Sequence, residues 1–142
     1  MVNFDEEEAL KGLTELVKLE AEWIPTEPGT ALYIRPFMFG NDEQLGVHAV
    51  KHATFMIIAS PTGSYYKQGF QPVRIMIEDT DVRAVRGGTG YAKCGGNYAA
   101  STRAGEKAEQ QGYSQVLWLD GVERKYVEEV GAMNVMFKIN GE

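Results

Sequence analysis

The chain has 142 residues, with ordinary hydrophobic and charged fractions of 44% and 24%, and this length suits one modest globular domain or parts of two. Its formal net charge of −6 argues against nucleic acid or an anionic membrane surface as a partner. A single cysteine, Cys94, excludes an intrachain disulfide and is typical of a reducing, cytoplasmic setting.

An amphipathic helix is predicted over residues 5–23, where apolar residues recur at three-to-four spacing and acidic residues fill the first turn, as the helix dipole favours. Asp5, with Glu8 three residues later, resembles a capping box, and the prolines and glycine of segment 25–29 end the helix. This acidic start is the opposite of the basic start of a signal peptide, and the longest apolar runs of the chain are far too short to span a bilayer.

Residues 30–78 have the pattern of a sheet. Three strands are predicted there, at 31–39, at 54–60 and at the alternating stretch around 73–77. The second strand is apolar enough to be central, and a turn is predicted after it at 61–64.

The two histidines of the chain, His48 and His52, lie four residues apart in this region. The residues between them lack the glutamate of a zinc-protease helix. We therefore expect two surface histidines and no metal site.

Segment 83–96 differs from its surroundings, because it holds five glycines interrupted by Lys93. Such a segment fits a linker between two domains, an active-site loop, or both. Beyond it, Asn97 is a good N-cap for a helix that runs to about Gln111, with Gly112 at the C′ position. Three further strands are predicted, at about 115–119, 125–130 and 133–139.

Lys93 is the first candidate for chemistry. It stands in a glycine-rich loop with little steric cover, just before a predicted helix N-terminus that disfavours a positive charge and so helps to supply the neutral amine of Schiff-base chemistry. The alternative is a solvated lysine in a mobile linker. The chain holds eight lysines, and position alone favours that alternative.

Two pairs of polar residues lie on predicted strands. Tyr33 and Arg35 share one face, where a guanidinium fork and a hydroxyl suit a carboxylate, although the polar face of an edge strand would give the same pattern. Glu128 and Glu129 point to opposite faces, and the inward one needs a cationic partner, such as a protonated pyridine nitrogen or an arginine. The alternative is a solvated pair at a strand end.

Five segments, taken together and in order, resemble the branched-chain amino acid aminotransferases, which are class IV (fold-type IV) enzymes that use pyridoxal 5′-phosphate (PLP). The longest match, Arg83-Ala-Val-Arg-Gly-Gly-Thr-Gly-Tyr-Ala-Lys-Cys-Gly-Gly-Asn-Tyr-Ala-Ala-Ser101, is highly specific. The other matching segments are 31–37, 60–65, 115–120 and 128–134.

This resemblance implies an α+β chain with a partial class IV aminotransferase fold. Residues 1–82 would form the remainder of a small α/β domain, and residues 83–92 would form an interdomain loop. Residues 93–142 would then begin the larger, PLP-binding domain.

The resemblance also implies roles for individual residues. Lys93 matches the catalytic lysine that binds PLP covalently, Tyr98 matches the tyrosine that hydrogen-bonds the phenolic oxygen of the cofactor, and Glu129 matches the carboxylate that pairs with its pyridine nitrogen. The implied substrate-binding residues are Tyr33, Arg35, Tyr65 and Ala132, the last through its backbone N–H.

The implied reaction is the transfer of nitrogen from leucine, isoleucine or valine to 2-oxoglutarate, by an enzyme that is a homodimer in the full-length family. Family members are much longer than this chain, which lacks the parts that grip the cofactor phosphate. It also stops after Asn140-Gly141, a hairpin-turn signal, without a return strand. We therefore expect a central fragment with weak or no activity.

Two alternatives stay open on sequence grounds. Other class IV enzymes, namely D-amino acid transaminases and aminodeoxychorismate lyases, share the lysine and the glutamate but usually not the Tyr-Ile-Arg-Pro strand. A folded domain without catalytic function is the second alternative.

Overall fold

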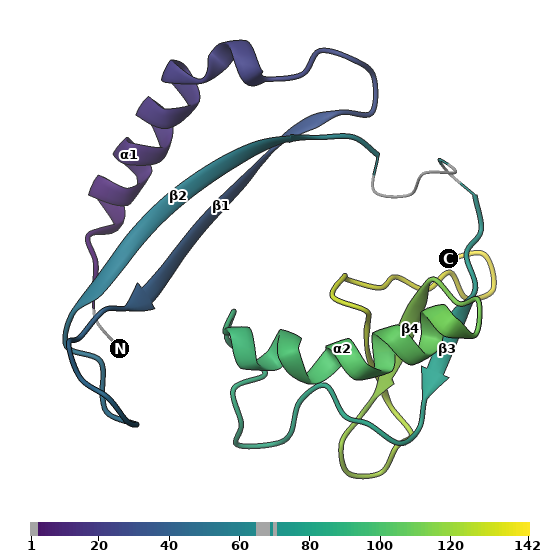
Figure 1. Cartoon of the computed structure of the whole chain (residues 1–142). Helices are drawn as coiled ribbons and strands as arrows, with labels where there is room; N and C mark the ends of the chain where they lie inside the picture. Colours follow the sequence, from purple (N-terminus) through teal and green to yellow (C-terminus); the bar gives the residue numbers. More distant parts are fainter. Residues whose placement is uncertain (1–2, 65–68, 70) are drawn as a thin grey trace. The chain divides into compact units, whose positions relative to one another are not determined.

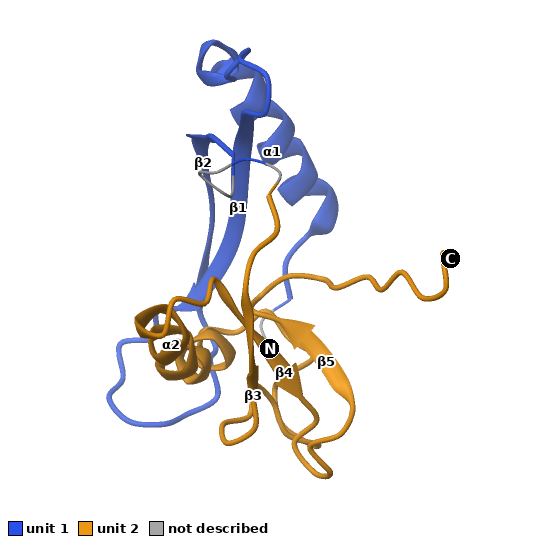
Figure 2. Cartoon of the chain, turned by 90° about the vertical axis from the view of Figure 1, so that its right-hand side faces the viewer, with its two compact units in different colours: residues 1–70 blue, residues 71–142 orange. Residues whose placement is uncertain are grey.

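The computed structural model describes residues 3–64, 69 and 71–142. The chain divides into two compact units, residues 1–70 and residues 71–142 (Figure 2). In this chain the strand Ile75–Glu78 lies in the second unit because it pairs with a later strand of that unit. The assignment of residues 1–82 to one domain of the longer parent stays a prediction.

Unit 1, residues 1–70, is one helix and a two-stranded antiparallel ribbon. Its elements are α1 (Glu6–Leu19), a 3-10 turn (Ala21–Trp23), β1 (Ala31–Gly40) and β2 (Ala53–Thr62). The side chain of Asp5 accepts hydrogen bonds from the backbone N–H groups of Glu7 and Glu8, which confirms the predicted N-cap.

Helix α1 runs along the ribbon (Figure 1), and the Phe4 and Phe55 rings stack with centroids 5.1 Å apart. Strand β2, which we expected to be central, pairs with β1 alone among the described residues. No residue that the structure describes in unit 1 is fully buried. Unit 1 is therefore an open layer rather than a closed core.

Unit 2, residues 71–142, has a three-stranded sheet covered by one helix. Its elements are β3 (Ile75–Glu78), α2 (Gly95–Gln110), β4 (Gln115–Leu119) and β5 (Val127–Val130). The strand order is β3-β4-β5, with β3 and β4 parallel and β4 and β5 antiparallel. Because a parallel pair requires a long crossover, α2 is the connection that makes this pairing possible.

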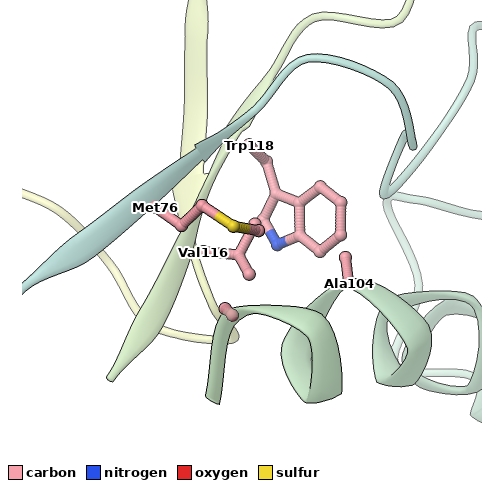
Figure 3. Packing of buried hydrophobic residues seen from close by; sticks show 5 residues of the cluster. Met76, Ala104, Val116 and Trp118 are labelled. Carbon is pink, nitrogen blue, oxygen red and sulfur yellow. The ribbon is translucent and has the colours of Figure 1, made fainter. Parts of the chain in front are cut away.

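The core of unit 2 lies between α2 and the sheet. Ala104 and Ala108 on α2 face Val116 and Trp118 on β4 and Met76 on β3, and Figure 3 shows the indole ring of Trp118 beside Ala104. Small residues on the helix bring it close enough to the sheet for Trp118 to be 1% exposed. Ile75 and Ile77 alternate along β3 as expected, and they lie on its exposed face, because α2 covers the other one.

Two predictions for unit 2 are wrong. Helix α2 begins at Gly95, so its N-cap is Cys94 and not Asn97. The predicted strand at 133–139 is absent from the described residues, where Val130 and Met133 form a single isolated bridge. Two other predictions for unit 2 agree with the structure. Gly112 follows helix α2 with a φ of 77°, and Asn140 and Gly141 form a turn with φ values of 52° and 93°.

No helix in the described part of the chain has the length and apolarity needed to cross a bilayer.

The loop that follows β4 is organised by one carboxylate. Asp120 accepts backbone hydrogen bonds from Tyr126 and Lys125 at 2.8 Å, from Glu123 at 2.6 Å and from Val122 at 3.1 Å. The bonds from Tyr126, then Glu123 and Lys125, hold the pKa of the Asp120 carboxyl well below its usual range. The ionised carboxylate therefore stabilises the folded loop.

We predict that Asp120→Asn lowers the stability of the chain at pH 7 and that this difference shrinks in acid. A lowered folded-state pKa gives stability that is complete above the unfolded pKa of about 3.9 and is lost as the pH falls through the folded value. Unfolding free energies from pH 7 to pH 3 for wild type, Asp120→Asn and the control Glu123→Gln check this. A difference that is the same at pH 7 and pH 3 would contradict it.

Candidate active site

Lys93 lies in the segment just before α2, with an exposed side chain. Its Nζ is 5.9 Å from the centroid of the Tyr98 ring, which stands in the first turns of the helix and is 40% exposed. The structure thus brings together two of the three predicted cofactor-binding residues.

Asn97 ties the loop ahead of Lys93 to the helix. Its Nδ2 donates to the backbone carbonyls of Thr89 and Ala92, both at 2.7 Å, and its Oδ1 accepts from the Thr89 hydroxyl at 2.8 Å. The side chain is buried and all three bonds reach back along the chain. The sequence predicted Asn97 as the N-cap of the helix, which is the wrong role. Its polar side chain four positions after Lys93 was the only sign in the sequence that it could hold the loop.

Two of the five glycines of this loop, Gly88 and Gly90, pack closely against earlier residues of the same loop. A Cβ added to Gly90 would lie 2.5 Å from the Cβ of Ala84, well inside van der Waals contact. Gly87 has a φ of 78°, a conformation that other residues rarely adopt. The loop is therefore packed around Gly88 and Gly90, which argues against a freely mobile linker.

Glu129 is half-buried on β5, opposite Trp118 in the β4–β5 register, and Glu128 is exposed. Its Oε2 lies 2.5 Å from Nε of Arg83. The two atoms do not align as a linear hydrogen bond, so the contact is an ion pair. Of the two cationic partners that the sequence left open for Glu129, the arginine is the one present in this chain.

The predicted substrate-binding residues of unit 1 lie on β1. Tyr33 and Arg35 share a face of the ribbon, and the guanidinium carbon of Arg35 is 5.1 Å from the centroid of the Tyr33 ring. Their partners across the ribbon are Ser60 and Ile58. Tyr65 lies outside the described residues.

Ala132, the predicted substrate-binding residue of unit 2, is exposed in the turn after β5, between the bridged residues Val130 and Met133.

An open groove of about 790 Å³ lies where the loops after β3 and β4 meet. Its charged lining residues are Arg83, Arg86, Asp120, Glu123 and Glu128. A smaller hollow of about 400 Å³ is lined by Arg83, glycines of the loop and Asn97. Neither hollow includes Lys93, Tyr98 or Glu129, so neither encloses the three predicted cofactor-binding residues.

The whole chain, residues 1–142, matches the family model for amino-transferase class IV. The chain belongs to the class IV aminotransferases. This membership confirms the resemblance to a transaminase family, and it agrees with an α+β chain that carries part of the family fold.

Individual class IV enzymes give a finer comparison. The chain is similar to branched-chain-amino-acid aminotransferase 2 of Bacillus subtilis (strain 168), with 57% identity over 97% of this chain and 38% of the relative. It is 58% identical to branched-chain-amino-acid transaminase 1 of the same organism, over 100% of this chain and 40% of the relative.

Solved structures agree with these relatives. The crystal structure of the T.th. branched-chain amino acid aminotransferase with pyridoxamine 5′-phosphate aligns with a TM-score of 0.72 and 28% identity over 91% of this chain and 41% of its own. The chain thus spans about 40% of the length of the relatives that it matches.

We predict that Asn97→Ala loosens the loop ahead of Lys93. Three hydrogen bonds are lost and two carbonyls lose their donor, which should lower the unfolding free energy by about 1–3 kcal/mol. Denaturant unfolding and amide hydrogen exchange over residues 89–93 measure the effect. Thr102→Ala, which removes one exposed hydroxyl from the same helix, is the control, and equal stability and exchange in the two variants would contradict the prediction.

Proposed function

We propose that this chain is the central part of a PLP-dependent transaminase that moves nitrogen from leucine, isoleucine or valine to 2-oxoglutarate. The observation that carries the proposal is the arrangement at the start of α2, where the exposed amine of Lys93 stands beside Tyr98 on a loop that Asn97 ties down. The names of the two Bacillus subtilis relatives support branched-chain amino acids over the substrates of other class IV enzymes.

The side chains of unit 2 fit the chemical groups of PLP. Its aldehyde requires an accessible amine, which Lys93 offers, and its phenolic oxygen requires a donor, which the Tyr98 hydroxyl supplies. Its pyridine nitrogen requires a carboxylate, and Glu129 has one that is half-buried on a strand. Its phosphate would be held by parts of the parent protein that this chain does not contain.

The chemistry of the proposed reaction is proton movement at the substrate Cα. When bound, PLP supplies an electron sink that makes the Cα–H bond acidic. The Lys93 amine is the general base that removes this proton and the general acid that returns one. Glu129 would hold the proton at the pyridine nitrogen, and Tyr98 would donate a hydrogen bond to the phenolic oxygen.

For substrate binding, we assign the face of β1 that carries Tyr33 and Arg35. The planar guanidinium of Arg35 suits the side-chain carboxylate of glutamate, the amino donor or product, and the Tyr33 hydroxyl assists it. Tyr65 belongs to the same proposed pocket, and the backbone N–H of Ala132 contributes to binding of the substrate carboxylate. The exposure of Tyr33 and Arg35 supports a role in contacting a ligand.

The proposed parent is a cytoplasmic homodimer whose partners are small amino acids and 2-oxo acids, with neither nucleic acid nor membrane among them. The acidic net charge and the single cysteine support this setting. The domain assignment is part of the proposal: 1–82 small domain, 83–92 loop, 93–142 start of the PLP-binding domain.

The first experiment assays the parent enzyme. Leucine with 2-oxoglutarate should yield glutamate, and D-alanine or aminodeoxychorismate should react far more slowly. Lys93→Ala should lower the rate by about 10²- to 10⁴-fold, the usual contribution of a general acid–base group. Activity that survives Lys93→Ala, or faster turnover of D-alanine than of leucine, would overturn the proposal.

The second experiment uses this 142-residue chain, which we expect to be weakly active or inactive. We predict that incubation with PLP and reduction with borohydride places the pyridoxyl mass tag on Lys93, with Lys93→Arg as the control. PLP should also raise the melting midpoint, because a ligand that binds only the folded state stabilises it. Tags spread over the eight lysines, with an unchanged midpoint, would mean that the chain alone holds no cofactor site.

A further inference from the structure

Arg83 lies in the segment after β3 and directs its guanidinium at the carboxylate of Glu129. The two side chains are 22% and 26% exposed. The contacting atoms, Nε and Oε2, are shielded from solvent, and neither has a hydrogen-bond partner among the described residues. Breaking such a pair would leave a charge alone in a poorly solvated place, so it holds both side chains in one arrangement.

We propose that Arg83 is a positioning residue for Glu129. Pairing at Oε2 leaves Oε1 as the oxygen that can accept from a second cationic donor. In the proposed function that donor is the protonated pyridine nitrogen of PLP, so this inference rests on that function. A guanidinium is charged at every working pH, so the pair exists before the cofactor arrives and orients the carboxylate in advance.

The backbone that carries Arg83 is itself fixed. Buried Glu78 accepts hydrogen bonds from the N–H groups of Thr80 and Asp81, at 2.7 and 2.8 Å. Arg124 donates to the carbonyls of the same two residues, both at 2.7 Å. Both the N–H groups and the carbonyls of the turn before Arg83 are therefore hydrogen-bonded. These bonds fix the backbone from which the Arg83 side chain extends.

An ion pair between Arg83 and Glu129 with a purely structural role would also affect stability. The test therefore observes the pyridine nitrogen of PLP directly. The parent enzyme is loaded with PLP labelled with 15N in the ring, and the 15N resonance is compared in wild type, Arg83→Met, Arg83→Lys and Glu129→Gln. Arg74→Met is the matched control, because Arg74 is an exposed arginine of unit 2 that packs on Tyr113.

We expect Arg83→Met to move the 15N resonance in the same direction as Glu129→Gln, and Arg83→Lys to move it less. Arg74→Met should leave it in place. Cofactor affinity should fall about tenfold or more in Arg83→Met, and the double variant with Glu129→Gln should lose little more than Glu129→Gln alone, because the two residues act as a unit.

Two results would overturn the inference. One is an unmoved 15N resonance in Arg83→Met. If the melting midpoint of this variant falls at the same time, Arg83 stabilises the fold without positioning Glu129. The other is additivity of the two single losses in affinity. Failure of the proposed function looks different: wild-type parent would then take up no PLP at Lys93, and in that case the positioning role is refuted with it.

Discussion

Trp118 is buried against α2 at the place where Ala104 and Ala108 leave room for its indole ring. This contact joins the two elements of unit 2 that position Lys93 and Glu129. The helix that it holds starts directly after Lys93, and the strand that carries Trp118 pairs with Glu129. Burying a large aromatic side chain contributes about 2–3 kcal/mol or more, so the amine and the carboxylate depend on one well-packed element. The indole N–H also donates to the carbonyl of Gly131 at 3.1 Å, which secures the turn before Ala132.

The two units differ in how they hold their candidate residues. In unit 2, Tyr98 and Glu129 stand on elements that also carry buried residues, Ala104 on α2 and Val130 on β5, and Lys93 lies just before α2. In unit 1, Tyr33 and Arg35 stand on an open ribbon with no fully buried described residue. Few apolar contacts mean a low cost of local opening, and we expect the ribbon of this chain to exchange its amide hydrogens faster than the strands of unit 2.

Much of the fold could be predicted from local signals. The Asp5 cap, the glycine after α2 and the apolar stretch of β4 each act within a few residues, and the structure agrees with them. Asn97 was misjudged because the cap rule reads neighbours along the chain, and its side chain instead reaches Thr89 and Ala92 through the folded loop. The strand expected at 133–139 does not form among the described residues: the segment pairs with the edge of β5 only through the single bridge between Met133 and Val130.

For the candidate site, the sequence predicted which residues could carry chemistry, but it did not predict which residues they contact. Sequence alone left the glycine-rich segment as either a linker or an active-site loop, because glycine content fits both. The contacts bear on mobility alone: Gly90 lies against Ala84 too closely for a side chain, Asn97 holds the loop from the helix, and Arg124 holds the turn at its other end. A segment bound at both ends and packed in between has lost the conformational freedom of a linker. Gly88 and Gly90 allow close approach of the backbone, and Lys93 is an exposed side chain just before the helix.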